Sequence, residues 1–164
     1  MIGYSGNEPL TDRTSIISYM TKQLANNKMV AVDVETISLE NTNPVGFSIA
    51  ISPTEAFYFT LYPELEDAIL WDTICNPSVK KIFHNALFDL SAMDEYDIDT
   101  TNIEDTMLMA MLLGVPASLA ELAKLVKIEV HPMSELLKSG QTTLDISVNE
   151  LAFKCCQDSK ATFA

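Results

Sequence analysis

The stretch KMVAVDVET, residues 28–36, is the clearest structural signal in the chain. It is rich in β-branched apolar residues and predicts a buried strand. Side chains alternate across a strand, so Asp33 and Glu35 share one face while Val32 and Val34 share the other. Two neighbouring buried carboxylates repel each other and lose hydration, which is costly unless their charge is neutralised. The pair therefore indicates a site for a divalent cation with oxygen ligands, the alternative being an exposed acidic pair on an edge strand.

Two further β-like runs follow this strand, at residues 45–51 and 56–61. A turn over residues 52–55, which includes Pro53, separates them. The three runs together predict an antiparallel meander. Residues 80–83 predict another short strand, and residues 102–105 predict a brief extended segment.

Helical patterns surround these strands. Apolar residues at Ile16, Ile17, Met20 and Leu24 predict an amphipathic leading helix over about residues 11–27. Capping residues and apolar spacing predict the other helices, at residues 63–74, 86–96, 106–113, 118–127, 134–138 and 147–163. This order predicts an α/β fold with a mixed central sheet flanked by helices. We expect one domain over residues 1–164, with its core at about residues 28–164.

The composition is that of a folded protein. Apolar residues make up 48% of the 164 residues and charged residues 20%, proportions that favour a packed core over disorder. No stretch approaches the roughly 20 apolar residues that span a bilayer, and the N-terminus lacks the pattern of a secretory signal. Cys75, Cys155 and Cys156 match neither a disulfide framework nor a zinc motif. We therefore expect a soluble, cytoplasmic protein without a membrane partner.

The net charge of −13 by itself argues against nucleic-acid binding, because phosphate contacts normally rely on Lys and Arg. Two explanations would reconcile the charge with a nucleic-acid substrate. Acidic residues gathered around a bound metal ion would present positive charge to a phosphate. Alternatively, another domain or a partner would hold most of the nucleic acid.

Two more acids lie in suggestive positions further along the chain. In the stretch HNALFD, residues 84–89, Asn85 and Asp89 are four positions apart and would share one face of a helix. Asp158 lies within the otherwise mostly apolar or neutral helix LAFKCCQDSKATF, residues 151–163. The alternatives are that Asn85 caps its helix, and that Asp89 and Asp158 are solvated acids.

Together these segments resemble the 3′–5′ exonuclease domain of the DNA polymerase I family, which belongs to the superfamily of exonucleases with four catalytic acids (DEDD). The resemblance covers about residues 29–164 and rests on the order of its motifs. These motifs are VDVETISL (32–39), NPVGFSIAI (43–51), HNALFD (84–89), EDTML (104–108), SLAELA (118–123) and the helix that carries Asp158. The resemblance implies a ribonuclease H-like fold and a proofreading-type nuclease.

The resemblance also implies roles for individual residues. Asp33, Glu35 and Asp158 would hold a first divalent cation, either Mg²⁺ or Mn²⁺. Asp33 would also contact a second ion, held by Asp89. The remaining implied substrate-side residues are Thr36 and Leu39, which would meet the terminal nucleotide, and Asn85, which would support the site.

Two divalent cations roughly 3.5–4 Å apart can stabilise the attacking and leaving oxygens of a phosphodiester and activate the attacking water. The expected reaction is therefore removal of nucleotides from the 3′ end of single-stranded or frayed DNA, with release of nucleoside 5′-monophosphates. The expected partners are the 3′ end of DNA and a polymerase domain or subunit.

Lys154 is the main departure from the family pattern. The family usually places a tyrosine four residues before the last acid, where it orients the attacking water, and the histidine of the sister group is also absent. Lys154 is thus a candidate catalytic residue that would hydrogen-bond the water or the phosphate; otherwise the site would be slow. Two alternatives stay open, a weak or silent module that supports a partner polymerase and an RNA-trimming exonuclease.

Three neighbouring residues receive structural interpretations. His84 is expected to pack or to cap a helix, although it adjoins the acidic segment. Asp105 is expected to cap the helix that begins at Thr106. His131, which precedes Pro132, is expected to lie in a loop.

Overall fold

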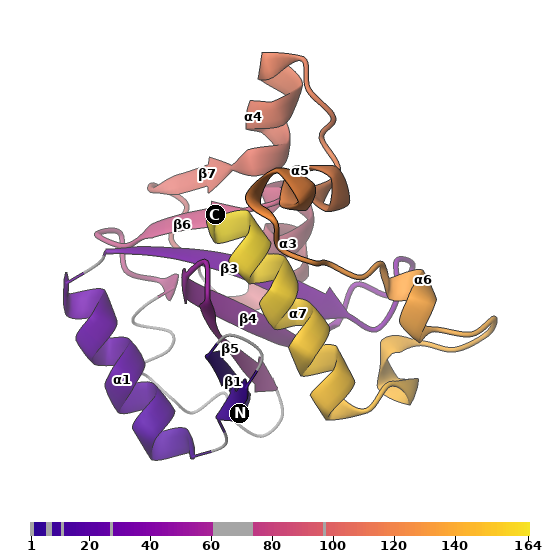
Figure 1. Ribbon diagram of the computed structural model, residues 1–164, viewed down its shortest axis with the longest axis horizontal. Helices are drawn as coiled ribbons and strands as arrows, with labels where there is room; N and C mark the ends of the chain where they lie inside the picture. Colours follow the sequence, from indigo (N-terminus) through magenta and orange to yellow (C-terminus); the bar gives the residue numbers. More distant parts are fainter. Residues whose placement is uncertain (1, 6–7, 11, 27, 61–73, 97) are drawn as a thin grey trace.

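The computed structural model describes residues 2–5, 8–10, 12–26, 28–60, 74–96 and 98–164 (Figure 1). Within these residues the strands form one seven-stranded sheet in the order β2-β1-β5-β4-β3-β6-β7. The strands are β1 (Ile2–Ser5), β2 (Glu8–Leu10), β3 (Met29–Thr36), β4 (Pro44–Ser52), β5 (Glu55–Thr60), β6 (Lys80–Phe83) and β7 (Ile103–Asp105).

The predicted meander is confirmed, because β3, β4 and β5 are consecutive antiparallel neighbours. β6 pairs in parallel with β3, and β7 pairs in parallel with β6, so the sheet is mixed as predicted. The sequence did not predict β1 and β2, which extend the sheet beyond β5. Strands of four and three residues are too short to show a period of two.

The helices agree with the sequence patterns except at two places. The predicted helix over 86–96 is wrong in its length: α3 ends at Ala92, and the amide of Met93 bonds to the carbonyls of Asp89 and Leu90 before a short 3₁₀ turn, η2, begins. The predicted helix over 63–74 lies, except for Ile74, outside the described residues. The helical elements are α1 (Arg13–Asn26), α3 (Ala86–Ala92), η2 (Asp94–Tyr96), α4 (Thr106–Leu113), α5 (Leu119–Val126), α6 (Met133–Leu136), η3 (Thr143–Asp145) and α7 (Val148–Phe163).

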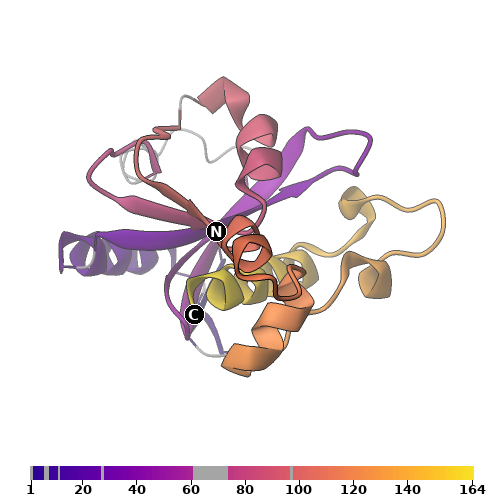
Figure 2. The same cartoon turned by 90° about the horizontal axis from the view of Figure 1, so that it is seen from above.

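Helices cover both faces of the sheet, and the alternation of β3 decides which residues each face receives. Val32 and Val34 pack in one cluster with residues of α1 and α3. Ala31 packs in the other cluster, beneath α7, with Cys155 and Cys156. Seen from above, α3 and α7 lie on opposite sides of the strands (Figure 2). Asp33 and Glu35 therefore point to the α7 side, as the period of two predicts.

None of the helices in the described ranges combines the length and the apolar character needed to cross a membrane.

Candidate active site

Asp33 and Glu35 lie near the C-terminal end of β3, on the face that α7 crosses. Glu35 is only 6% exposed, so the alternative of an exposed edge-strand pair is wrong. Glu35 pairs with Gly46 on β4, where any side chain would overlap the ring of Tyr58. Glycine at position 46 thus lets Tyr58 pack beside the acidic end of β3.

Asp89 approaches the same strand from the opposite layer. The parallel ladder between β3 and β6 ends at the pair Ala31–Ile82, so the next amides of β3 on that side have no strand partner in the described structure. Asp89 Oδ1 accepts one of these amides, the N–H of Val34, at 3.0 Å. Asp89 is 4% exposed, so it is not the solvated acid considered as an alternative.

Asp105 fixes the turn that leads into α3. It caps α4 as predicted, accepting the amides of Met107 at 2.9 Å and Leu108 at 3.2 Å. It also accepts the amides of Asn85 at 3.2 Å and Ala86 at 2.8 Å, at the start of α3. One carboxylate therefore caps the N-terminal ends of both α3 and α4, and it sets the position from which Asp89 reaches β3.

Asn85 is not a helical residue, and it does not share a helix face with Asp89. It adopts φ 75° and ψ 55°, a left-handed conformation, at the position before α3. Its side chain makes no capping hydrogen bond to the described part of the chain, and the cavity described below is lined without it. Its implied support of the site therefore stays a prediction.

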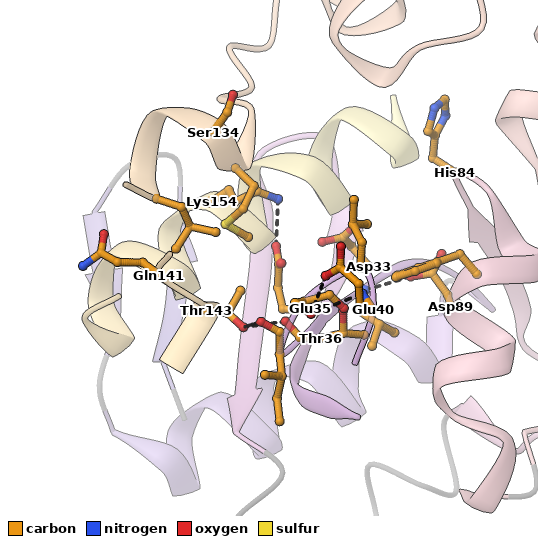
Figure 3. Close-up of a pocket in the computed structure, with 17 residues that line it drawn as sticks. Asp33, Glu35, Thr36, Glu40, His84, Asp89, Ser134, Gln141, Thr143 and Lys154 are labelled. Atoms are coloured by element: carbon orange, nitrogen blue, oxygen red, sulfur yellow. Dashed lines mark hydrogen bonds and ion pairs between the residues drawn. The ribbon is translucent and has the colours of Figure 1, made fainter. Parts of the chain in front are cut away.

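Lys154 and Asp158 project from the same side of α7 toward β3. Lys154 Nζ donates to Asp158 Oδ2 at 2.7 Å and to Glu35 Oε1 at 2.8 Å; the bond to Glu35 is drawn in Figure 3. Lys154 is 9% and Asp158 8% exposed. Asp158 is thus buried at the site, and the alternative of a solvent-facing acid is wrong.

Crowding and burial oppose ionisation of all four acids. Burial and the charge of Asp158 raise the pKa of Asp33 well above its ordinary value. Burial also raises the pKa of Glu35 and of Asp158, although the Lys154 ammonium opposes this shift. Burial raises the pKa of Asp89 to about 8, against the hydrogen bond from Val34. For Lys154, burial lowers the pKa, but Glu35 and Asp158 outweigh it and hold the ammonium charged.

The donor set suits a cation that prefers oxygen ligands. Asp158 Oδ1 is buried without a hydrogen-bond partner among the described residues, an arrangement that a bound cation would relieve. Ligand atoms of Asp33, Glu35 and Cys155 lie within 4.8 Å of one another. Burial and the nearby carboxylates raise the pKa of the Cys155 thiol well above its ordinary value, so it stays protonated and donates to Asp33 Oδ2 at 3.2 Å. The carboxylates are then the available ligands.

These side chains open onto a cavity of about 500 Å³ (Figure 3). Many of its lining residues are ones that the sequence pointed to, namely Asp33, Glu35, Thr36, Leu39, His84, Asp89 and Lys154. Leu39 is 83% exposed at the rim. Asp158 does not belong to the lining in the described structure, whereas Lys154, which bonds to it, does.

Several residues around the cavity carry no signal in the sequence that pointed to the site. Cys155 contacts Asp33, while Ser134, Gln141 and Thr143 contribute to the wall. Thr143 Oγ1 donates to the carbonyls of Thr36 and Ile37, and so ties down the segment after β3 that carries Leu39. The signal at Thr143 was the capping box of η3, Thr142 with Asp145, which predicts a turn but not its tertiary partner.

His84 lies at the far end of the cavity from Lys154 (Figure 3). Its Nδ1 is 2.9 Å from Thr106 Oγ1, at the start of α4, and burial lowers its pKa. The expected packing or capping role therefore stays a prediction, and the contact with Thr106 is a side-chain hydrogen bond. His131 lies in a loop as expected, partly exposed, with its Nδ1 3.0 Å from Glu135 Oε2.

Comparison with known proteins connects this geometry to a family. A family model described as 3′–5′ exonuclease matches residues 10–156. The catalytic core of RRP6 from Trypanosoma brucei has a similar fold, with a TM-score of 0.65 and 21% identity over 93% of this chain and 43% of that one. No curated protein sequence is significantly similar to the chain.

Two further solved structures share the fold at low identity. Trypanosoma brucei RNase D in complex with RNA U12 gives a TM-score of 0.67 and 13% identity, over 92% of this chain and 58% of that one. The POL domain of Pol1 from M. smegmatis, in complex with DNA primer-template and dNTP, gives 0.66 and 12%, over 93% of this chain and 25% of that one. The chain thus spans less than half of the RRP6 core and about a quarter of the Pol1 chain.

Proposed function

Because the chain belongs to the 3′–5′ exonuclease family of the DNA polymerase I type, with a ribonuclease H-like DEDD fold, we propose that it removes nucleotides from the 3′ end of single-stranded or frayed DNA. The products would be nucleoside 5′-monophosphates. The proposed active unit is a single exonuclease domain over residues 1–164, with the leading helix α1 and the catalytic core after it.

One observation carries this proposal. Asp33 and Glu35 on β3, Asp89 on α3 and Asp158 on α7 are far apart in sequence, yet Lys154 links Glu35 to Asp158 and the Val34 amide links β3 to Asp89. Three buried acids and the half-buried Asp33 so close together, with raised pKa values, are unfavourable without cations. Such clusters are typical of sites whose chemistry depends on the charge.

The cofactors that suit these oxygen ligands are Mg²⁺ or Mn²⁺, and exonucleases of this family generally use divalent metal ions. We assign a first ion to Asp33, Glu35 and Asp158, and a second to Asp33 and Asp89. When bound, the two ions would stabilise the charge that develops on the attacking and leaving oxygens.

The protein's own groups would position the terminal nucleotide. Thr36 lies in the cavity wall directly after the acids, which suits a contact near the 3′-hydroxyl. Leu39 projects at the rim, where an exposed apolar side chain can pack against a base. The hydrogen bonds from Thr143 hold the segment between them in place.

Lys154 is the proposed catalytic residue at the position of the family's tyrosine. An ammonium has three donors and no acceptor, so Lys154 could hold a phosphate oxygen or the attacking water but could not accept its proton. Proton removal would then fall to solvent or to a carboxylate of the site.

Attachment to a polymerase would supply the affinity that this acidic chain lacks. With a net charge of −13, it has few cations to offer a phosphate backbone. The likeness to a Pol1 chain bound to DNA primer-template supports a polymerase domain or subunit as partner. Cys75, Cys155 and Cys156, which match no disulfide framework, support a reducing, cytoplasmic setting.

RNA trimming is the second candidate function. It is supported by the likeness to RNase D in complex with RNA, and the metal chemistry would be the same. The cavity contains several hydroxyl and amide groups, such as Ser134 and Gln141, but their positions do not by themselves select a sugar.

The test is digestion of a 5′-labelled single-stranded DNA, with Asp33→Ala as control and an RNA of the same sequence in parallel. The reaction is run without metal, with Mg²⁺ and with Mn²⁺. We expect a metal-dependent ladder of shortened DNA that is absent with Asp33→Ala, and chromatography should identify 5′-monophosphates. Faster digestion of RNA would favour the second candidate, and no digestion of either strand would leave a silent module.

A further inference from the structure

The Lys154 ammonium lies between two of the carboxylates assigned to the first metal ion. Its Nζ is 2.8 Å from Glu35 Oε1 and 2.7 Å from Asp158 Oδ2. Both acids and the lysine are buried, so water screens this interaction poorly. Asp158 is four residues from Lys154 on α7, and the spacing of one helical turn presents both side chains to β3.

This arrangement places one positive charge where the family's tyrosine would be neutral. A divalent cation binds carboxylate oxygens at about 2.0–2.1 Å for Mg²⁺. It would compete with Lys154 for the carboxylates of Glu35 and Asp158, which already accept hydrogen bonds from the ammonium. An ammonium and a divalent ion within the same cluster would also repel each other strongly, because burial lowers the local dielectric.

The remaining contacts indicate where the ion would gain and lose ligands. Asp158 Oδ1 has no hydrogen-bond partner in the described structure, so it is free to take a cation. Lys154 lines the cavity together with Ser134 and Gln141, which lie on its side of the site in Figure 3. The lysine side chain therefore borders an open cavity, walled in part by polar groups, into which its ammonium can withdraw.

We propose that Lys154 is a tethered competitor of the first divalent cation, and that binding of this ion requires the ammonium to leave Glu35 and Asp158. The inference rests on the proposed role of these acids as metal ligands. Its consequence is a first metal site of low affinity, so that the chain would be loaded only at high concentrations of the ion. When metal is scarce, the Lys154 ammonium would balance the charge of Glu35 and Asp158 and so help the protein to stay folded.

The experiment is calorimetric titration of the metal-free protein with MnCl₂, comparing the parent with two substitutions at one position. Lys154→Met keeps the length and removes the charge, whereas Lys154→Arg keeps the charge. Lys124→Met is the matched control, because it removes the charge of an exposed lysine that pairs with Glu121 on α5. Circular dichroism verifies that each variant is folded.

We expect Lys154→Met to bind Mn²⁺ at least roughly tenfold more tightly than the parent. The reason is that the substitution removes the repulsion between the ammonium and the ion, and a tenfold gain is only part of the repulsion expected between cations about 4 Å apart near a protein surface. Lys154→Arg and Lys124→Met should bind like the parent. Equal or weaker binding by Lys154→Met, or no binding by any folded variant, would overturn the proposal.

A second substitution covers the case in which Lys154→Met does not fold. Lys154→Tyr is neutral and can still hydrogen-bond a carboxylate, so it should show the same gain in affinity. Metal-induced increases in melting temperature, measured on the same proteins, give an independent readout. The gain should be larger for the neutral variants than for the parent.

The outcomes also separate this inference from the proposed function. Metal-dependent DNA digestion by the parent, without tighter Mn²⁺ binding by the neutral variants, would reject the competitor role and leave the exonuclease proposal intact. Tighter Mn²⁺ binding by the neutral variants without digestion of DNA or RNA would support the competitor role and reject the exonuclease proposal.

Discussion

The four acids of the site form two pairs that differ in how their charge is compensated. Glu35 and Asp158 share the ammonium of Lys154. Asp33 and Asp89 form no ion pair within the described residues, and their hydrogen bonds come from neutral donors, the Cys155 thiol and the Val34 amide.

The difference shows that a neutral hydrogen-bond donor and a counterion stabilise a buried acid in different ways. A neutral donor satisfies an oxygen but leaves the charge in place, so the pKa of Asp89 remains at about 8 despite its bond from Val34. The Glu35–Asp158 pair carries its own cation, whereas the Asp33–Asp89 pair depends on protonation or on an ion from solution. Neutralising an acid should therefore lower folding stability in the Glu35–Asp158 pair and change it little in the Asp33–Asp89 pair.

The largest expected effect separates activity from stability at Asp89. Asp89→Asn keeps an oxygen that can accept the Val34 amide but loses the charge that would hold the second ion. We expect exonuclease activity to fall at least about 100-fold, as when a group that stabilises transition-state charge is removed, with little loss of folding stability. Single-turnover digestion and urea unfolding measure the two quantities, and retained activity would remove Asp89 from the metal site.

In the Glu35–Asp158 pair, which shares the Lys154 ammonium, neutralising one acid should lower folding stability. Glu35→Gln removes one of the two carboxylates that bind Lys154 and leaves the buried ammonium with a weaker partner. We expect the free energy of unfolding of the metal-free protein to fall by about 2 kcal/mol. Urea unfolding of Glu35→Gln and Asp89→Asn at neutral pH tests this contrast. Equal free energies of unfolding for the two variants would contradict the difference between the pairs.

The pH dependence of stability should reveal the uncompensated pair. The pKa of Asp89 rises from 3.8 to about 8 on folding, so between these values the folded protein holds a proton that the unfolded chain has released. The contribution of Asp89 to the stability of the metal-free protein should therefore be fully present below about pH 4 and be lost as the pH rises to about 8.

We expect the melting temperature to decrease over this range, and the decrease to be smaller in Asp89→Asn. Differential scanning calorimetry in a chelating buffer measures both. A melting temperature that rises across the range would mean that Asp89 is ionised in the folded chain. Saturating Mn²⁺ should flatten the curve of the parent if the acids bind the ion.

The smallest expected effect lies at Cys155, the thiol that contacts Asp33. Cys155→Ala removes a weak donor and leaves a small cavity, so we expect a loss of about 1 kcal/mol in stability. Activity should change less than about threefold, because the carboxylate of Asp33 remains. A loss as large as that of Asp89→Asn would instead place the sulfur among the metal ligands.

Local patterns predicted the fold and the candidate site only in part. The period of two in β3 correctly placed Asp33 and Glu35 on one face of the strand, because it depends on the strand alone, and this face meets Lys154 and Cys155 of α7. The bridge from Lys154 to Glu35 could not be predicted in this way, since it depends on how α7 crosses β3. The end of α3 at Ala92 and the short strands β1 and β2 likewise depend on tertiary contacts.

The family resemblance supplied what the spacing of residues could not. Asp158 taken alone was indistinguishable from a surface acid, and only the order of the motifs pointed to the site. The departure at Lys154 was visible in the sequence, but its position between two carboxylates was not.

The double capping by Asp105 also limits how this fold can change its length. Because one side chain accepts amides from both helix starts, inserting or deleting a residue next to position 85 or 105 would shift the approach of Asp89 to β3. The connection around η2, residues 94–96, carries no such constraint from Asp105. A change of chain length there should therefore disturb the approach of Asp89 to β3 less than one beside residue 85 or 105.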